Sequence, residues 1–106
     1  MATYRGLPVR TTQGGFKVFK DDGPLDPARS LKAVNHSPDG FNWGYGGSGP
    51  AQLALALLLE ETDEATALTL YQKFKWDLIA HFPSDHFWVL KSEAIQHWIQ
   101  KQEVRA

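Results

Sequence analysis

The most continuous hydrophobic segment of the chain is the run 51–59, in which Gln52 is the only polar residue. Its five leucines point in every direction around a helical axis, and a helix that is apolar on all sides is buried on all sides. The run is far shorter than the roughly 20 residues that cross a membrane. It therefore predicts a core helix, with Ser48 as its cap and Pro50 in its first turn, where a missing N–H costs nothing.

A second helical pattern follows this run. Thr62 or Asp63 can cap a helix that continues to about Phe82, and Pro83 ends it. Its apolar residues recur three or four positions apart and predict one buried stripe, made of Ala67, Leu68, Tyr71, Phe74, Leu78, Ile79 and Phe82. Lys75 lies within the stripe and has to extend its ammonium toward water, whereas Trp76 projects from the opposite side.

Strand patterns stand near both ends of the chain. Residues 3–10 and 15–20 favour two strands joined by the TTQGG hairpin loop, because Phe16 and Val18 alternate with Lys17. A turn is expected at 21–24, a brief strand is possible at 41–43, and 87–90 predicts a further strand. Residues 28–34 fit either a helical turn or an irregular edge segment. After Ser92, which can cap it, a last helix presents Ile95, Trp98 and Ile99 on one face.

Together these elements predict an α+β domain, with a small antiparallel sheet of three to four strands packed against two to three helices. The 106 residues suit a single domain, 1–106, with one core. The absence of cysteine excludes disulfides and thiol chemistry. No signal-peptide pattern begins the chain, so we expect a cytoplasmic protein.

Charge changes this picture little. The net charge of −1 provides no overall field that attracts nucleic acid. The charges are unevenly placed, however, since residues 1–35 are rich in Lys and Arg and residues 36–70 contain acids and no Lys or Arg. This asymmetry is only a hint of partners, and two solvated faces are the preferred explanation.

The glycine-rich stretch 44–50 leads into a helix start, where free amides can bind an anion. The candidate ligand-binding residues are His36, Ser48, Gly46, Gly47 and Gly49. The stretch has neither the lysine of a phosphate loop nor the spacing of a dinucleotide fingerprint. The preferred interpretation is that the glycines let a tight loop pack under Trp43 and Tyr45.

No catalytic residue, metal site or cofactor is assigned. Ser48 and Asp39 have capping and turn roles, which explain them without a hydrolytic triad. His81 and His86 lack the i, i+4 spacing of a helical metal pair, and Pro83 separates them. Enzymatic activity is left open, and the expectation favours a non-enzymatic protein.

Four tryptophans in 106 residues are more than packing usually needs. Trp43, Trp88 and Trp98 fit core or core-margin positions, but Trp43 with Tyr45, or Trp76, could instead form an aromatic anchor for a protein partner. The candidate aromatic residues are Trp43, Tyr45 and Trp76. The acidic candidates are Glu60, Glu61 and Glu64. The same rings could instead stack on RNA, helped by Arg10, Lys17 and Lys20.

Three segments carry a family resemblance: HSPDGFNWGYGGSGPAQLALALLL at 36–59, Tyr71 to Lys75, and the WVL run before Ile95 and Trp98. Through these segments the chain resembles a family of small uncharacterised bacterial and phage proteins, a domain of unknown function. The resemblance implies a gene carried by phages, plasmids and integrated elements, so the expected cytoplasm is that of a bacterial host. It implies no catalytic residue.

Three functions are compatible with these patterns. The first is a non-enzymatic binding protein of a mobile element that blocks a host defence complex, such as a CRISPR effector, through protein contacts. The second is a ligand-binding or catalytic domain that uses residues 44–50 with His36, and it predicts a pocket at the helix start. The third is nucleic-acid binding through the basic N-terminal strands. The first is preferred, and the oligomeric state is left open.

Overall fold

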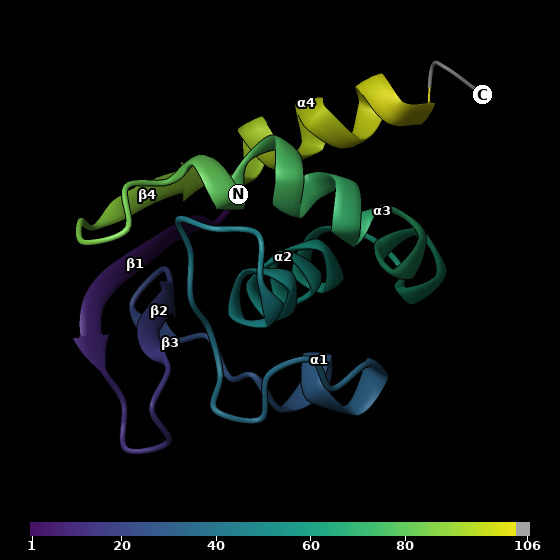
Figure 1. The fold of residues 1–106 in the computed structure, drawn as a ribbon. Helices are drawn as coiled ribbons and strands as arrows, with labels where there is room; N and C mark the ends of the chain where they lie inside the picture. Colours follow the sequence, from purple (N-terminus) through teal and green to yellow (C-terminus); the bar gives the residue numbers. More distant parts are fainter. Residues whose placement is uncertain (104–106) are drawn as a thin grey trace.

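A four-stranded antiparallel sheet forms one layer of the structure, and the helices lie on one side of it (Figure 1). The strands are β1 (Thr3–Arg10), β2 (Phe16–Lys20), β3 (Gly23–Pro24) and β4 (Trp88–Lys91), in the order β3-β2-β1-β4. This computed structural model describes residues 1–103, and residues 104–106 lie outside the description. The predicted α+β class is confirmed.

The predicted hairpin and the C-terminal strand are confirmed, and two local expectations are corrected. The turn expected at 21–24 occupies only residues 21–22, because Gly23 and Pro24 already pair with β2. The possible strand at 41–43 is reduced to one bridge between Phe16 and Phe41. The turn before it is anchored to the hairpin, since the Gly15 N–H donates to the Asp39 carbonyl.

The helices are α1 (Ala28–Ala33), α2 (Ser48–Glu61), α3 (Glu64–Asp77) and α4 (Ser92–Glu103), with a 3₁₀ turn η1 (Ile79–His81) after α3. The segment left open at 28–34 is therefore helical. Within residues 1–103, no helix is long and apolar enough to cross a membrane.

Helix α3, which the sequence predicted to continue to about Phe82, ends at Asp77. Leu78 leaves the helical conformation, and the following turn brings the Ile79 carbonyl to the Gly44 N–H at 3.0 Å. The chain after α3 is thus bonded to the glycine-rich loop. Leu68, expected in the buried stripe, is exposed.

Two of the three predicted caps are wrong. Asp63 caps α3 by accepting from the Thr66 N–H at 2.7 Å. Ser48, however, is the exposed first residue of α2, and Gly47 holds the cap position without a side-chain bond. Ser92 is the first residue of α4, and its hydroxyl bonds outside that helix.

The central helix α2 is buried on every side, as its composition predicts. Every residue from 49 to 59 is buried, with the sheet, α1, α3 and α4 arranged around it (Figure 1). The core face of the sheet contributes Tyr4, Val18 and Trp88. The central helix is therefore the part of the core that the other elements share.

Gln52 is the polar exception in α2, and each of its hydrogen-bonding positions has a partner. Its Oε1 accepts from the backbone N–H groups of His36 at 2.8 Å and Ser37 at 3.1 Å. Its Nε2 donates to Ser30 Oγ and to the Val34 carbonyl, both at 3.0 Å. A side-chain amide has two donors and an acceptor oxygen with two lone pairs, so this amide is fully used. It holds α1 and residues 34–37 against α2.

We expect Gln52→Leu to lower the free energy of unfolding by about 3 kcal/mol. The buried Ser30 hydroxyl and the part-buried backbone groups of Val34, His36 and Ser37 lose their partner in this variant. Amide hydrogen exchange at His36 and Ser37 should accelerate. The matched control is Gln72→Leu at an exposed position of α3, which should change stability by less than about 0.5 kcal/mol. Equal losses in the two variants, measured by chemical denaturation, would contradict the role given to Gln52.

Candidate functional site

Two exposed aromatic rings lie directly against the glycine-rich loop. A Cβ on Gly46 would lie 2.1 Å from the Trp76 ring, and one on Gly47 would lie 2.3 Å from the Tyr45 ring. Tyr45 is nevertheless 50% exposed and Trp76 is 56% exposed. Glycine is needed here because the rings occupy the space of a side chain. The loop is therefore a close-packed support for two rings that remain largely accessible to solvent.

Lys75 fastens this loop to α3. Its side chain is buried, and its Nζ donates to the Gly46 carbonyl at 3.1 Å. The same ammonium lies 4.5 Å from the centre of the Trp76 ring, within the range of a cation–π contact. In residues 1–103, no carboxylate lies within 4.0 Å of it. The sequence indicated only that Lys75 had to extend out of its stripe. The structure shows that its ammonium is directed at the backbone of the glycine-rich loop.

The expected ligand residues occupy different environments. The His36 ring is 2.5 Å from the Tyr71 hydroxyl, and Gly49 packs against Asn42. Ser48 is exposed at the start of α2. Among residues 1–103, no hydrogen bond joins His36 to Ser48 or to the loop. The space that Gly46 and Gly47 leave free is occupied by the rings of Trp76 and Tyr45. A ligand role for these glycines, His36 and Ser48 stays a prediction.

Trp43 is a core residue, so its place in the expected partner surface is wrong. Its side chain is 0% exposed, and its indole N–H donates to the Pro83 carbonyl at 3.1 Å. The centre of its ring lies 4.8 Å from that of Phe16 and 5.7 Å from that of Trp88. The large apolar area of an indole explains this burial. Helical periodicity placed Trp76 opposite the buried stripe of α3, whereas Trp43 lies in a loop without a periodic pattern, so the sequence alone could not decide its burial.

The acidic residues of the expected surface are largely bonded within the molecule. Glu60 pairs with Lys20 at 2.7 Å and lies 3.9 Å from Arg29. Glu64 is exposed in the first turn of α3. These residues lie at the C-terminal end of α2 and Tyr45 precedes its N-terminal end, a separation of about 20 Å for a helix of this length. The expected aromatic and acidic residues do not form one patch.

Glu61 joins three elements. Its carboxylate accepts from the hydroxyls of Tyr4, at 2.5 Å, and Ser92, at 2.8 Å, and from Gln96 Nε2 at 3.1 Å. Burial acts to raise the pKa of Glu61, but these hydrogen bonds and the charge of Lys20 outweigh it, so the pKa falls below its ordinary value. Burial and the bond to Glu61 raise the pKa of Tyr4, whose hydroxyl therefore stays protonated and donates.

A groove of about 650 Å³ lies away from the glycine-rich loop, between β2, the start of α1 and the turn at 38–41. Its apolar lining includes Phe16, Phe19, Phe41, Pro24, Pro27 and Pro38. None of its lining residues belongs to the stretch 44–50, where the sequence predicted a pocket. The groove combines segments far apart in the sequence, so no local motif indicated it.

Comparison with known proteins assigns a family and no activity. The model of a family of unknown function (DUF6166) matches residues 4–101. No curated protein and no solved structure matches the chain. The chemistry of the site therefore has to be inferred from the residues themselves.

Replacing Glu61 by glutamine should make stability less dependent on pH. The pKa of Glu61 is lowered by folding, so its carboxylate stabilises the fold above its ordinary pKa of 4.5, and this contribution is lost as the pH falls through the folded-state value. We expect Glu61→Gln to cost about 2 kcal/mol at pH 7, since hydrogen bonds to a charged group are the stronger kind. The difference from the wild type should shrink on acidification.

Chemical denaturation at a series of pH values measures this difference. Asp22→Asn, at an exposed position of the turn after β2, is the control and should cost less than about 0.5 kcal/mol at any pH. A loss in Glu61→Gln that stays constant from neutral to acidic pH would show that its charge contributes nothing.

Proposed function

Since the chain belongs to the family of unknown function DUF6166, its role has to come from its own residues, and we propose that it is a non-enzymatic protein-binding module. The proposed contact surface, here called the loop aromatic patch, consists of Tyr45 and Trp76 on the glycine-rich loop. The observation that carries the proposal is that both rings are about half exposed while the backbone beneath them is held in place.

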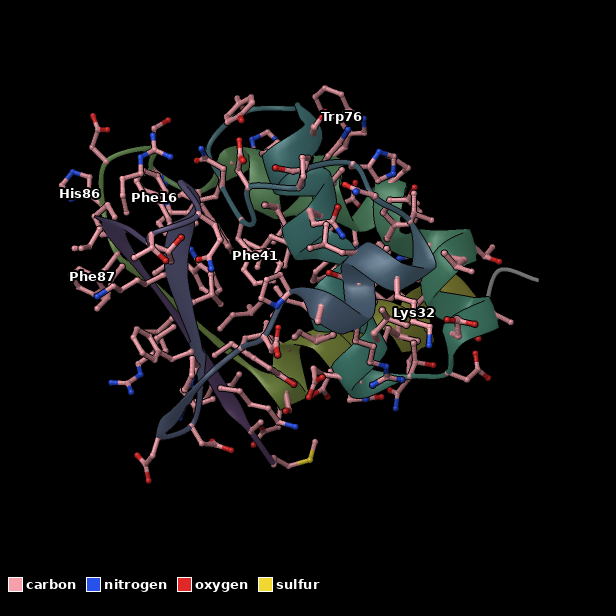
Figure 2. The ribbon with its side chains drawn as sticks, turned by 90° about the horizontal axis from the view of Figure 1, so that it is seen from below. Phe16, Lys32, Phe41, Trp76, His86 and Phe87 are labelled. Atoms are coloured by element: carbon pink, nitrogen blue, oxygen red, sulfur yellow. The ribbon has the colours of Figure 1, made fainter. Side chains whose placement is uncertain are left out.

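The chemistry of the loop aromatic patch supports this role. Tyrosine and tryptophan are enriched among the residues that dominate binding energy at interfaces, because they bury a large area with few rotatable bonds. A ring already positioned on a rigid support loses little conformational entropy when a partner covers it. Trp76 lies at the surface beside the helices (Figure 2).

Lys75 favours an acidic partner surface. A buried ammonium without a neighbouring carboxylate is costly, and a partner's Asp or Glu close to the loop would compensate its charge. Its field is weakly screened because little water surrounds it. We therefore propose a partner with an apolar pocket for the indole and a carboxylate at the rim of that pocket.

The mobile-element origin implied by the resemblance narrows the class of partner. We propose that the chain is of phage or mobile-element origin and blocks a host defence complex, such as a CRISPR effector, by covering part of its surface. A small domain without an active site can act in this way because occupation of a surface requires only binding. The loop aromatic patch is the surface we assign to that contact.

The first test is affinity capture from nuclease-treated lysate of a bacterium that carries a CRISPR effector, followed by binding to the purified partner. We expect Trp76→Ala and Tyr45→Ala each to weaken binding by about 30-fold, which corresponds to about 2 kcal/mol for a dominant interface residue. Leu68→Ala, which removes another exposed apolar side chain of α3, should leave the affinity unchanged. Absence of a nuclease-resistant partner would argue against the proposal.

A second variant tests the support of the rings and not the rings themselves. In Gly46→Ala the new Cβ meets the Trp76 ring at 2.1 Å, so the indole has to leave the loop while it remains in the protein. We expect about tenfold weaker binding with the fold intact. Gly23→Ala is the matched control, since a Cβ there meets nothing within 4 Å. Unchanged affinity in Gly46→Ala would show that the position of the indole does not matter.

A further inference from the structure

The second surface of interest is the face of the sheet that no helix covers. Tyr4, Gly6 and Val18 are buried on the core side, and side chains alternate between the two faces of a strand. The pairing of β1 with its neighbours then places a set of residues on the opposite side, here called the outer sheet face: Arg5, Leu7, Lys17, Phe19, Val89 and Lys91. The helices all lie on the other side (Figure 1).

The outer sheet face is basic. Arg5, Lys17 and Lys91 stand on three adjacent strands, and within residues 1–103 none has a carboxylate within 4.0 Å. Lys20, on the core side of β2, is instead neutralised by Glu60. Asp21 ends this face, and its carboxylate accepts from a backbone amide of β1 at 3.0 Å. The Arg5 guanidinium donates to the Asp21 backbone carbonyl at 3.0 Å. Three cations without a carboxylate partner thus share one surface of a protein whose net charge is −1.

Apolar side chains alternate with these cations. Leu7 is paired with Lys17, and Arg5 stands between Phe19 and Val89 in one row across the sheet. The Arg5 guanidinium lies 5.9 Å from the centre of the Phe19 ring. Leu7 is 41% exposed and Val89 is 52% exposed. The surface is therefore neither a purely ionic patch nor a continuous apolar one.

Phe87 extends this pattern at the edge of the sheet. It directly precedes β4, is 65% exposed, and projects on the side of the sheet away from the helices (Figure 2). A phenyl ring with this exposure contributes little to the core. Its free faces are available for stacking.

We propose that the outer sheet face binds single-stranded nucleic acid. Cations without a carboxylate partner attract the phosphates, while the exposed Phe87 and the half-buried Phe19 provide rings on which bases stack. This combination binds single strands with little sequence preference. An amphipathic helix would need a continuous apolar groove, and here Lys17 is paired with Leu7 while Arg5 separates Phe19 from Val89. Charge complementarity and isolated rings thus favour a single strand over a protein.

Fluorescence anisotropy with a labelled oligothymidine and an oligouridine of about 12 nucleotides, within the site sizes of single-strand binders, tests the proposal at low salt. We expect Arg5→Ala combined with Lys17→Ala to weaken binding at least tenfold, and Phe87→Ala to weaken it about fivefold. The logarithm of the wild-type affinity should fall with the logarithm of salt concentration with a slope of about −2, as three phosphate contacts predict.

The control removes the same charge from the other side of the molecule. Lys32→Ala combined with Lys101→Ala takes two exposed cations from helices, and Figure 2 shows Lys32 on the helical side. This variant should bind the oligonucleotides within twofold of the wild type. Trp76→Ala should also bind them normally, so failure here is distinguishable from failure of the loop aromatic patch.

Three results would overturn the proposal. They are absence of measurable binding at low salt, an equal loss in the Lys32 and Lys101 control, and binding of an acidic peptide to this face in preference to the oligonucleotides. The second would indicate diffuse charge attraction, and the third a protein partner. Selective loss in the variants of β1, β2 and Phe87 would support it.

Discussion

The burial of α2 on every side is the constraint on which the rest of the structure depends. An apolar helix can be covered in many registers, because dispersion and the hydrophobic effect have little directional preference. Gln52 removes this freedom, since its amide bonds to α1 and to residues 34–37 with every donor and acceptor used. One buried amide thus converts a non-specific contact into a defined one, and the path of the chain into the glycine-rich loop follows from it.

The two ends of α2 differ in how their polar and apolar groups are covered, and the proposed recognition surface lies at only one of them. At its C-terminal end, the Glu61 carboxylate joins β1 and α4 through hydroxyl and amide donors. At its N-terminal end, Lys75 and two glycines hold a loop whose rings face solvent. Polar groups at the first end are satisfied internally, whereas the second end keeps a large apolar area uncovered. That contrast is why recognition is assigned to the loop aromatic patch.

The sheet divides the basic residues of the N-terminal half by strand alternation. On the core side, Lys20 meets Glu60 and its charge is neutralised. On the outer sheet face, Arg5 and Lys17 meet no carboxylate, so a nearly neutral protein carries a local positive surface. Net charge describes long-range fields, while contact with phosphates depends on such local arrangements. The two proposed surfaces lie on different elements and can act independently.

Local patterns in the sequence determined the elements: the hairpin, the buried central helix, the Asp63 cap and the C-terminal strand all follow from periodicity and turn chemistry. The family resemblance likewise depended on a contiguous motif. Tertiary structure alone decided that Trp43 is buried and where Lys75 donates. Helical periodicity placed Trp76, which is 56% exposed, opposite the buried stripe, but no such pattern surrounds Trp43, which is 0% exposed. The physical reason is that exposure and pairing depend on residues distant in the chain, such as Gly46 for Lys75, 29 positions away, and Tyr4 for Glu61, 57 positions away.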